Sequence, residues 1–98
     1  MKENAFQKEL IIDIKKRFPD AIILKNDPTY IQGIPDLLIL HKDKWASLEC
    51  KNSKNAKRQP NQEYYVGKMK EMSYSSFIFP ENREEVLNEL SRAFGVRG

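Results

Sequence analysis

The segment from residue 33 to residue 51 constrains the fold of this chain more than any other stretch. An apolar run over residues 37–40 is followed by four polar residues, 41–44, and then by loosely alternating residues, 45–50. Short runs of this kind on either side of a polar turn are typical of two paired strands. We therefore expect a β-hairpin with its turn at residues 41–44.

The turn decides which residues face each other across the hairpin. If Leu40 pairs with Trp45, Asp36 lies directly opposite Glu49, with Cβ atoms roughly 4.5–5.5 Å apart. Lys51 shares their face because side chains alternate along a strand. A change of one residue in the turn would place the two acids on opposite faces of the sheet.

Two carboxylates that face each other need something to offset their repulsion. At a separation of about 4 Å they repel by roughly 4 kcal/mol if the effective dielectric constant is near 20. A shared proton, the Lys51 ammonium group or a divalent cation could offset this. Mg2+ usually binds one or two carboxylates, water and a substrate phosphate. The set therefore indicates metal-assisted phosphodiester hydrolysis. A surface hairpin with scattered charges and a metal-free ion pair with Lys51 are the alternatives.

Size and composition limit the classes of protein to consider. Ninety-eight residues suffice for one small domain, 1–98, and so small a core makes a homodimer reasonable. A net charge of +3 is compatible with nucleic-acid binding. Cys50 is the single cysteine, so we expect no disulfide partner and a reducing compartment. The sequence has no signal-peptide pattern and no apolar run near the ~20 residues that span a membrane, which predicts a soluble cytoplasmic protein.

Residues 2–18 have the spacing of an amphipathic helix that ends before Pro19. Glu3 falls in the middle of the apolar stripe, and Gln7 lies near it. A carboxylate there either caps the first turn, which is favourable by about 0.3–1 kcal/mol, or points into a site. On the helix alone, capping is the simpler interpretation. The stripe consists of Phe6, Leu10, Ile11, Ile14 and Phe18.

The rest of the chain completes an α/β pattern. An apolar strand over residues 21–25 is of the kind expected in a covered sheet, and residues 26–35 form a loop. After the hairpin we expect a helix over residues 60–72, with Tyr64 or Tyr65, Val66, Met69 and Met72 on its apolar side, a strand at 76–79 and a closing helix through Phe94. The predicted fold is a small mixed sheet flanked by helices.

Residues 52–60 are polar and basic and lack apolar anchors. This segment leaves the strand that carries Glu49 and Lys51, so its cations lie beside the proposed metal site, where a phosphate backbone would need them. From charge alone, a solvated loop is the alternative. The cations are Lys54, Lys57 and Arg58.

Two further side chains have a simple structural interpretation. His41, the single histidine, lies in the predicted turn, where solvent exposure is a better expectation than a catalytic role. Trp45 shares the face of Glu49 in the predicted register. It could stack on a base, but core packing is the better expectation.

Four short motifs follow one another along the chain: Glu3 with Gln7, Gly33-Ile34-Pro35-Asp36, Glu49-Cys50-Lys51 and Pro60-Asn61-Gln62. Their order resembles the PD-(D/E)XK nuclease superfamily and, more narrowly, the VRR-NUC (virus-type replication-repair nuclease) domain, which includes stand-alone phage proteins of about this size. The resemblance implies a restriction-endonuclease-like αβββαβ core with a C-terminal helix. It also implies the host cell cytoplasm as the location if the chain is phage-encoded.

The resemblance implies a metal site on the hairpin. Asp36 and Glu49 would bind Mg2+ or Mn2+, with the backbone carbonyl of Cys50 as a further ligand. Glu3 matches the acid of the family's first helix and would join them. The Cys50 side chain would point to the opposite face as a small apolar group.

The other matched residues would act on the substrate. Lys51 would position the attacking water and stabilise charge on the phosphoryl group. Gln62 would contact water or phosphate, and Gln7 would contact DNA together with the basic residues Lys54, Lys57 and Arg58.

The function implied is a metal-dependent endodeoxyribonuclease that cuts branched or flapped DNA, such as Holliday junctions, as a homodimer in replication, recombination or repair. The alternative is a non-catalytic nucleic-acid-binding or assembly protein on the same fold. The facing acids argue against that alternative because binding alone has no use for them.

Overall fold

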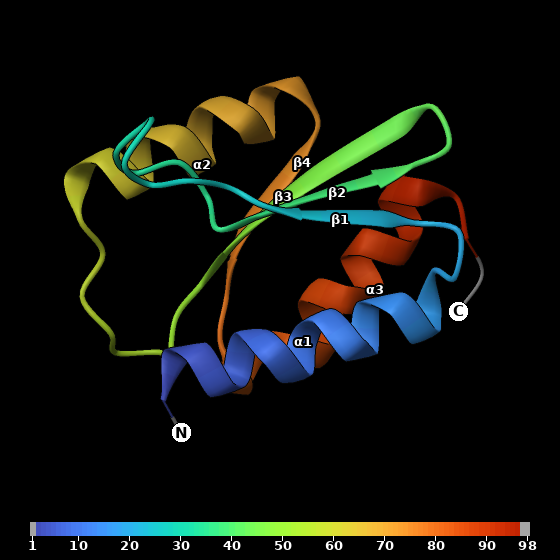
Figure 1. Cartoon of the computed structure of the whole chain (residues 1–98), viewed down its shortest axis with the longest axis horizontal. Helices are drawn as coiled ribbons and strands as arrows, with labels where there is room; N and C mark the ends of the chain where they lie inside the picture. The colour runs from blue at the N-terminus through green and yellow to red at the C-terminus, as the bar shows by residue number, and fades with distance from the viewer. Residues whose placement is uncertain (1, 97–98) are drawn as a thin grey trace.

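A four-stranded sheet forms the centre of the computed structural model, which describes residues 2–96 (Figure 1). The elements, in chain order, are α1 (Glu3–Arg17), β1 (Ile22–Lys25), β2 (Leu37–His41), β3 (Lys44–Cys50), α2 (Pro60–Met72), β4 (Tyr74–Ile78), the 3-10 helix η1 (Pro80–Asn82) and α3 (Arg83–Phe94). The strands lie in sequence order, with β1, β2 and β3 antiparallel. Helix α2 crosses over so that β4 runs parallel to β3. The sheet is mixed, as predicted.

The hairpin has the predicted register with a tighter turn. Leu40 pairs with Trp45 and Leu37 with Leu48. Each strand extends one residue further than expected, so only Lys42 and Asp43 form the turn. Lys42 has a φ of 57°, as two-residue hairpin turns commonly require. Shortening the turn at both ends equally leaves the pairing unchanged.

The main core lies between the sheet and the helix pair α1 and α3, below the sheet in Figure 1. The predicted stripe of α1 supplies much of it, since Phe6, Leu10, Ile14 and Phe18 are each at most 1% exposed. Helix α2 lies on the other face, over a small cluster of Val66, Phe77 and Phe79. The two faces of β3 are therefore buried by different helices.

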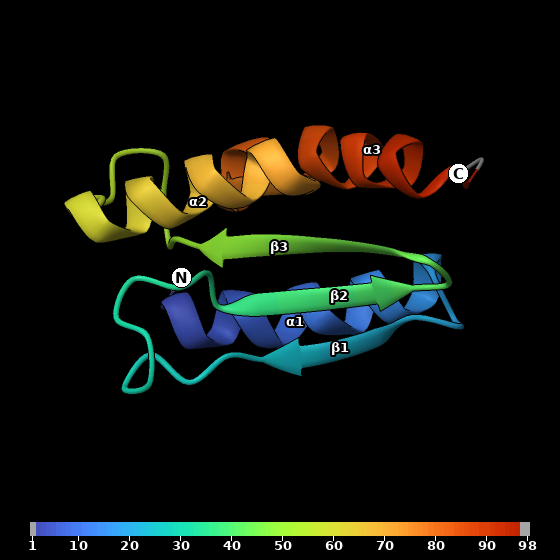
Figure 2. The ribbon, with the colours of Figure 1, turned by 90° about the horizontal axis from the view of Figure 1, so that it is seen from above.

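The expectation that the first strand is covered is wrong on one face. Helix α2 packs mainly on β3 and β4, so the same face of β1 and β2 lies open beside it (Figure 2). Ile22 and Leu24 are 58% and 44% exposed. Trp45 is only half-buried, and Met72, expected on the apolar side of its helix, is 64% exposed. One helix is too narrow to cover four strands.

The expectation that His41 is exposed to solvent is also wrong. Because β2 extends to this residue, alternation places its side chain with Leu37 and Ile39 on the face of α1 and α3. The imidazole stacks on Phe94 at 5.1 Å between ring centroids and meets the edge of Phe18 at 5.7 Å. Its Nδ1 is buried without a hydrogen-bond partner. His41 is therefore part of the core.

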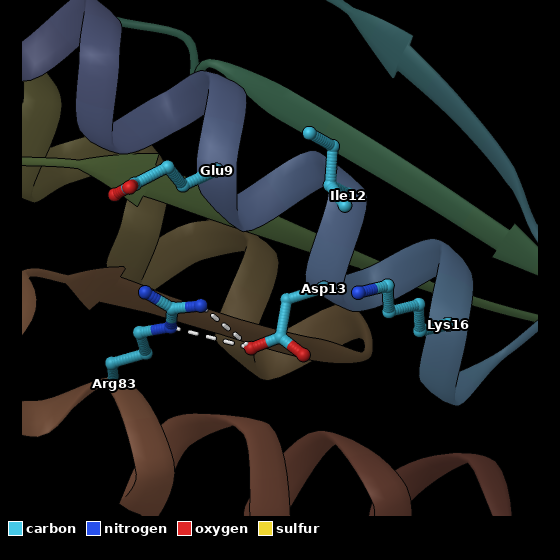
Figure 3. A pocket seen from close by; sticks show the side chains of 5 residues that line it. All are labelled: Glu9, Ile12, Asp13, Lys16 and Arg83. Atoms are coloured by element: carbon cyan, nitrogen blue, oxygen red, sulfur yellow. Dashed lines mark hydrogen bonds and ion pairs between the residues drawn. The ribbon is translucent and has the colours of Figure 1, made fainter.

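Ion pairs fasten α1 to α3 on the far side from α2. Asp13 accepts hydrogen bonds from the Arg83 guanidinium at 2.8 and 3.3 Å (Figure 3), and Arg17 binds Glu84 at 2.8 Å. A pocket of about 260 Å3 lies here, lined by Glu9, Ile12, Asp13, Lys16 and Arg83. Two of its charged residues, Asp13 and Arg83, are paired across the helices, which gives that pair a structural role.

Between residues 2 and 96, no helix combines the length and hydropathy needed to cross a bilayer.

The loop before β2 packs tightly on the start of α2. Gly33 has a φ of +91°, and a Cβ atom added there would lie 2.7 Å from Cγ of Asn61. This approach brings the chain leading into Asp36 against the helix that carries Gln62. A side chain at position 33 would have to push the two apart.

We expect Gly33→Ala to lower the free energy of unfolding by more than 1 kcal/mol, because strain of about 1–3 kcal/mol at a positive φ adds to the clash with Asn61. Gly67→Ala is the matched control. Gly67 lies within α2 with open space around it, so alanine should stabilise by roughly 0.5–1 kcal/mol. Urea unfolding of both variants measures the difference. Equal effects would show that the close approach to α2 is unimportant.

Candidate active site

Asp36 and Glu49 come together at the open end of the hairpin. Asp36 directly precedes β2, and the pairing of Leu37 with Leu48 continues to place it across from Glu49. The backbone N–H of Cys50 donates to Oδ2 of Asp36 at 2.9 Å. This bond holds the Asp36 carboxylate against β3 and confirms the predicted juxtaposition of the two acids.

A hydrogen-bond network connects Glu49 and Lys51 to helix α2. Gln62 donates from Nε2 to Oε2 of Glu49 at 3.1 Å and accepts at Oε1 from Nζ of Lys51 at 2.8 Å. Nζ of Lys51 lies 3.9 Å from Oε2 of Glu49. Glu49 is 3% exposed and Lys51 8%. The amide of Gln62 therefore holds the side chains of Glu49 and Lys51 at a fixed spacing, in a site with little exposure to solvent.

The first turn of α2 orients Gln62. The backbone N–H of Gln59 donates to Oε1 of Gln62 at 3.0 Å. This bond is the one that the third helical residue makes in a capping box, and Pro60 stands at the start of the helix. The spacing Gln59-x-x-Gln62 is the sequence signal for it, although serine or threonine more commonly takes the first position.

Burial and mutual repulsion raise the pKa values of the acids. The pKa of Glu49 is raised to about 8, chiefly by burial and then by the charge of Asp36, against the opposing effect of Lys51. Burial also raises the pKa of Asp36, which the Cys50 N–H and Lys51 partly offset. Without a cation, the Glu49 carboxyl group therefore retains its proton at neutral pH.

Helix α1 contributes the third acid, at its exposed first turn. Partial burial and the charge of Asp36 raise the pKa of Glu3, while Lys51 lowers it, which places the Glu3 carboxylate in the same electrostatic environment. Gln7, one turn further, is half-buried, and its side chain opposes the rise in the pKa of the Cys50 thiol that burial causes. Gln7 thus lies on the α1 side of β3 and supports Cys50 in the core.

The donor atoms at this site fit a hard divalent cation. Among the hydrogen bonds of residues 2–96, Asp36 uses only Oδ2 and Glu49 only Oε2, so one oxygen of each carboxylate is free. The N–H and C=O of a strand residue point the same way, so the Cys50 carbonyl is directed to the side of Asp36. Mg2+ commonly binds one or two carboxylates and completes its shell with water. Within the described part of the chain, no three Asp, Glu, His or Cys residues are grouped closely enough to hold a metal by themselves.

The basic residues Lys54, Lys57 and Arg58 are exposed on the segment between β3 and α2. Two contacts hold this segment. The backbone N–H of Lys54 donates to both carboxylate oxygens of Glu81 at 3.2 Å, and the Arg58 guanidinium lies 4.1 Å from the centroid of the Phe77 ring. Phe77 lies in β4 and Glu81 in η1. None of the sequence motifs predicted that these two residues contact the basic segment.

The leading helix, antiparallel hairpin and parallel fourth strand define the predicted small α/β fold. Solved structures share this fold, among them two whose names refer to the same domain. One, described as "VRR_NUC domain protein", has a TM-score of 0.71 and 15% identity over 98% of this chain and 90% of that chain. Another, described as "VRR_NUC domain", has a TM-score of 0.67 and 21% identity over 88% of this chain and 94% of that chain. No family model and no curated protein sequence matches. The chain therefore has the VRR_NUC fold, a nuclease-type fold.

The raised pKa of Glu49 predicts how stability depends on pH. The carboxyl group binds its proton more tightly in the folded chain, with a pKa of about 8, than in the unfolded chain, where it is near 4.5. Its contribution to stability is therefore complete below about pH 4.5 and is lost as the pH rises toward about 8. In EDTA, the melting temperature should fall over this range.

Glu49→Gln is the matched control, because glutamine keeps the shape of the side chain and removes the titration. Its melting temperature should depend less on pH in EDTA than that of the unchanged protein. Thermal unfolding followed by circular dichroism across the pH range measures both. A melting temperature that rises with pH over this range in the unchanged chain would contradict a proton held on Glu49.

Proposed function

We propose that this protein is a divalent-metal-dependent endodeoxyribonuclease. The observation that carries the proposal is the arrangement at the open end of the hairpin, where Asp36 faces Glu49 and Gln62 joins Glu49 to Lys51. Like charges in so buried a position are costly unless a cation neutralises them. The nuclease-type fold of the solved structures supports the same reaction class.

Each residue of the site has a distinct task in this proposal. Asp36, Glu49 and the Cys50 carbonyl hold the cation, with Glu3 as a further acid from α1. Bound Mg2+ or Mn2+ would supply a water of lowered pKa and polarise the scissile phosphate. Lys51 stabilises the charge that develops on the phosphoryl oxygens. Gln62 holds Lys51 and Glu49 at their observed spacing.

The substrate in this proposal is DNA, with branched or flapped forms preferred, as in replication, recombination or repair. The sheet end that carries the acids adjoins the segment with Lys54, Lys57 and Arg58, which offers positive charge to a phosphate backbone. The names of the two similar structures, which refer to the VRR_NUC domain, support a nucleic acid as the substrate.

The proposal includes a homodimer formed through the open sheet face. Ile22 pairs with Leu40 and Leu24 with Leu38, so these four apolar side chains share one face beside Trp45. Leu38, Leu40, Trp45 and Met69 line a cavity of about 340 Å3 on it. Contiguous exposed apolar surface of this kind marks interaction sites. A second copy would bury it and would bring two cutting sites to a branched substrate.

Asp36→Asn and Lys51→Ala should each lower the rate of DNA cleavage by a factor of about 100 or more, because Asp36 holds the proposed cation and Lys51 offsets charge on the phosphoryl oxygens. Cleavage of fluorescent four-way, flap and linear duplex DNA with Mg2+ or Mn2+ measures the effect. Lys16→Ala, an exposed lysine at the far end of α1, is the control and should cut normally. Circular dichroism checks that each variant folds.

Two outcomes would contradict this function. The first is unchanged protein that leaves every DNA substrate intact with either metal. The second is DNA binding that neither Asp36→Asn nor added metal alters, which would favour a non-catalytic binding protein. A rise in melting temperature on adding Mg2+ that is lost in Asp36→Asn would separate a metal site from a structural ion pair.

Leu24→Lys should convert the dimer to a monomer, because it places a charge on the open sheet face. Light scattering should give twice the 11.5 kDa mass of one chain for the unchanged protein and the single-chain mass for the variant. Ile12→Lys is the matched control, since Ile12 is 52% exposed but lies on α1, across the sheet from that face. An unchanged protein of 11.5 kDa at every concentration would remove the dimer from the proposal.

A further inference from the structure

We propose that Phe77 is a positioning residue that holds the Arg58 guanidinium beside the acids, and that Arg58 is the main contact of residues 52–59 with a DNA phosphate next to the scissile one. This inference rests on the proposed nuclease function. It singles out one cation of the basic segment and assigns a role to an aromatic residue that no sequence motif indicated.

Phe77 lies beside Glu49 in the sheet. The two residues are partners in the parallel pairing of β3 with β4, and adjacent strands are about 4.8 Å apart. Both side chains are on the α2 face, where Phe77 joins Val66 and Glu49 binds Gln62. Phe77 is 8% exposed, so packing holds its ring in place. A group seated on this ring therefore has a defined position relative to the acids.

Arg58 is seated on that ring. Its Cζ atom lies 4.1 Å from the ring centroid, within the range of about 6 Å for a cation–π interaction. A cation–π contact is electrostatic and does not require the guanidinium N–H groups to donate hydrogen bonds. Among residues 2–96, no hydrogen bond or ion pair of Arg58 with another side chain is present. A phosphate could therefore bind the guanidinium in bidentate fashion.

The rest of the segment is held at a second point. The carboxylate of Glu81 binds the backbone N–H of Lys54, while Arg58 directly precedes Gln59, which caps α2. Figure 1 shows the segment leaving β3 and returning to α2 at one end of the sheet. Lys57 is exposed, and in the described part of the chain it makes no contact with an aromatic ring like that of Arg58 with Phe77. Arg58 therefore loses less conformational freedom on binding than Lys57 does, which favours it as the phosphate contact.

The alternative is that Arg58 only covers the apolar cluster of Val66, Phe77 and Phe79. A covering role would change stability without changing DNA affinity or its salt dependence. Binding measurements at several salt concentrations therefore separate the two roles, because each lost phosphate contact lowers the slope of log K against log salt by about 0.9.

The experiment measures binding of the full chain to four-way and duplex DNA by fluorescence anisotropy in EDTA, where no cutting occurs, over a series of salt concentrations. Arg58→Gln should weaken binding about 5–10-fold and reduce the slope by about one. Arg58→Lys should weaken binding about 2–5-fold with the slope kept, because the charge remains but the planar guanidinium is lost. Lys57→Gln, the matched neighbour, should have less than half the effect of Arg58→Gln.

Phe77→Leu tests the positioning role and should weaken binding about 2–5-fold. Combined with Arg58→Gln it should add nothing further, because the ring acts only through Arg58. With Mg2+, Arg58→Lys should raise KM and leave kcat nearly unchanged. If Phe77→Leu does not fold, the KM effect and kept slope of Arg58→Lys decide the question.

Three results would overturn the inference. They are additive effects of Phe77→Leu and Arg58→Gln, an Arg58→Gln effect no larger than that of Lys57→Gln, or Arg58 variants that change only the melting temperature. These results can occur in a protein that cuts DNA normally, so they would leave the nuclease proposal intact. A chain that neither binds nor cuts DNA would overturn both.

Discussion

The structure depends most on the repulsion between two carboxylates that the hairpin register places face to face. Asp36 and Glu49 cannot separate, because the backbone N–H of Cys50 holds one and the strands on either side enclose the other. Two features reduce this repulsion: the raised pKa of Glu49, which keeps a proton on its carboxyl group, and the positive charge of the nearby Lys51 ammonium. This electrostatic cost is the one that the proposed cation would offset.

The surrounding elements supply the remaining contacts to that pair. Helix α2 is anchored by its own capping box, and the same amide that completes the box reaches Glu49 and Lys51. Gly33 lets the chain before Asp36 approach the same helix closely. The geometry of the site therefore depends both on how α2 packs against the loop before β2 and on the backbone conformation of Gly33.

Much of this arrangement is predictable from the sequence because it depends on local pattern. The helix stripe, the hairpin register and the glutamine of α2 follow from periodicity and motif order. The exposure of Ile22 and the burial of His41 do not, because they depend on which strands a helix covers and on one extra residue of strand. The cation–π contact of Arg58 with Phe77 joins residues that are far apart in the sequence, so no local sequence pattern predicts it.

The parallel pairing of β3 with β4 has a consequence for the timing of folding. All the residues of the acid, lysine and glutamine cluster lie before residue 63, yet the strand that encloses Glu49 is formed by residues 74–78. Pairings between distant segments form late because the chain between them must first close a loop. During synthesis, the emerging chain therefore carries its acids and lysine before it can bury and align them. The strand that encloses Glu49 can form only after residues 74–78 have left the ribosome.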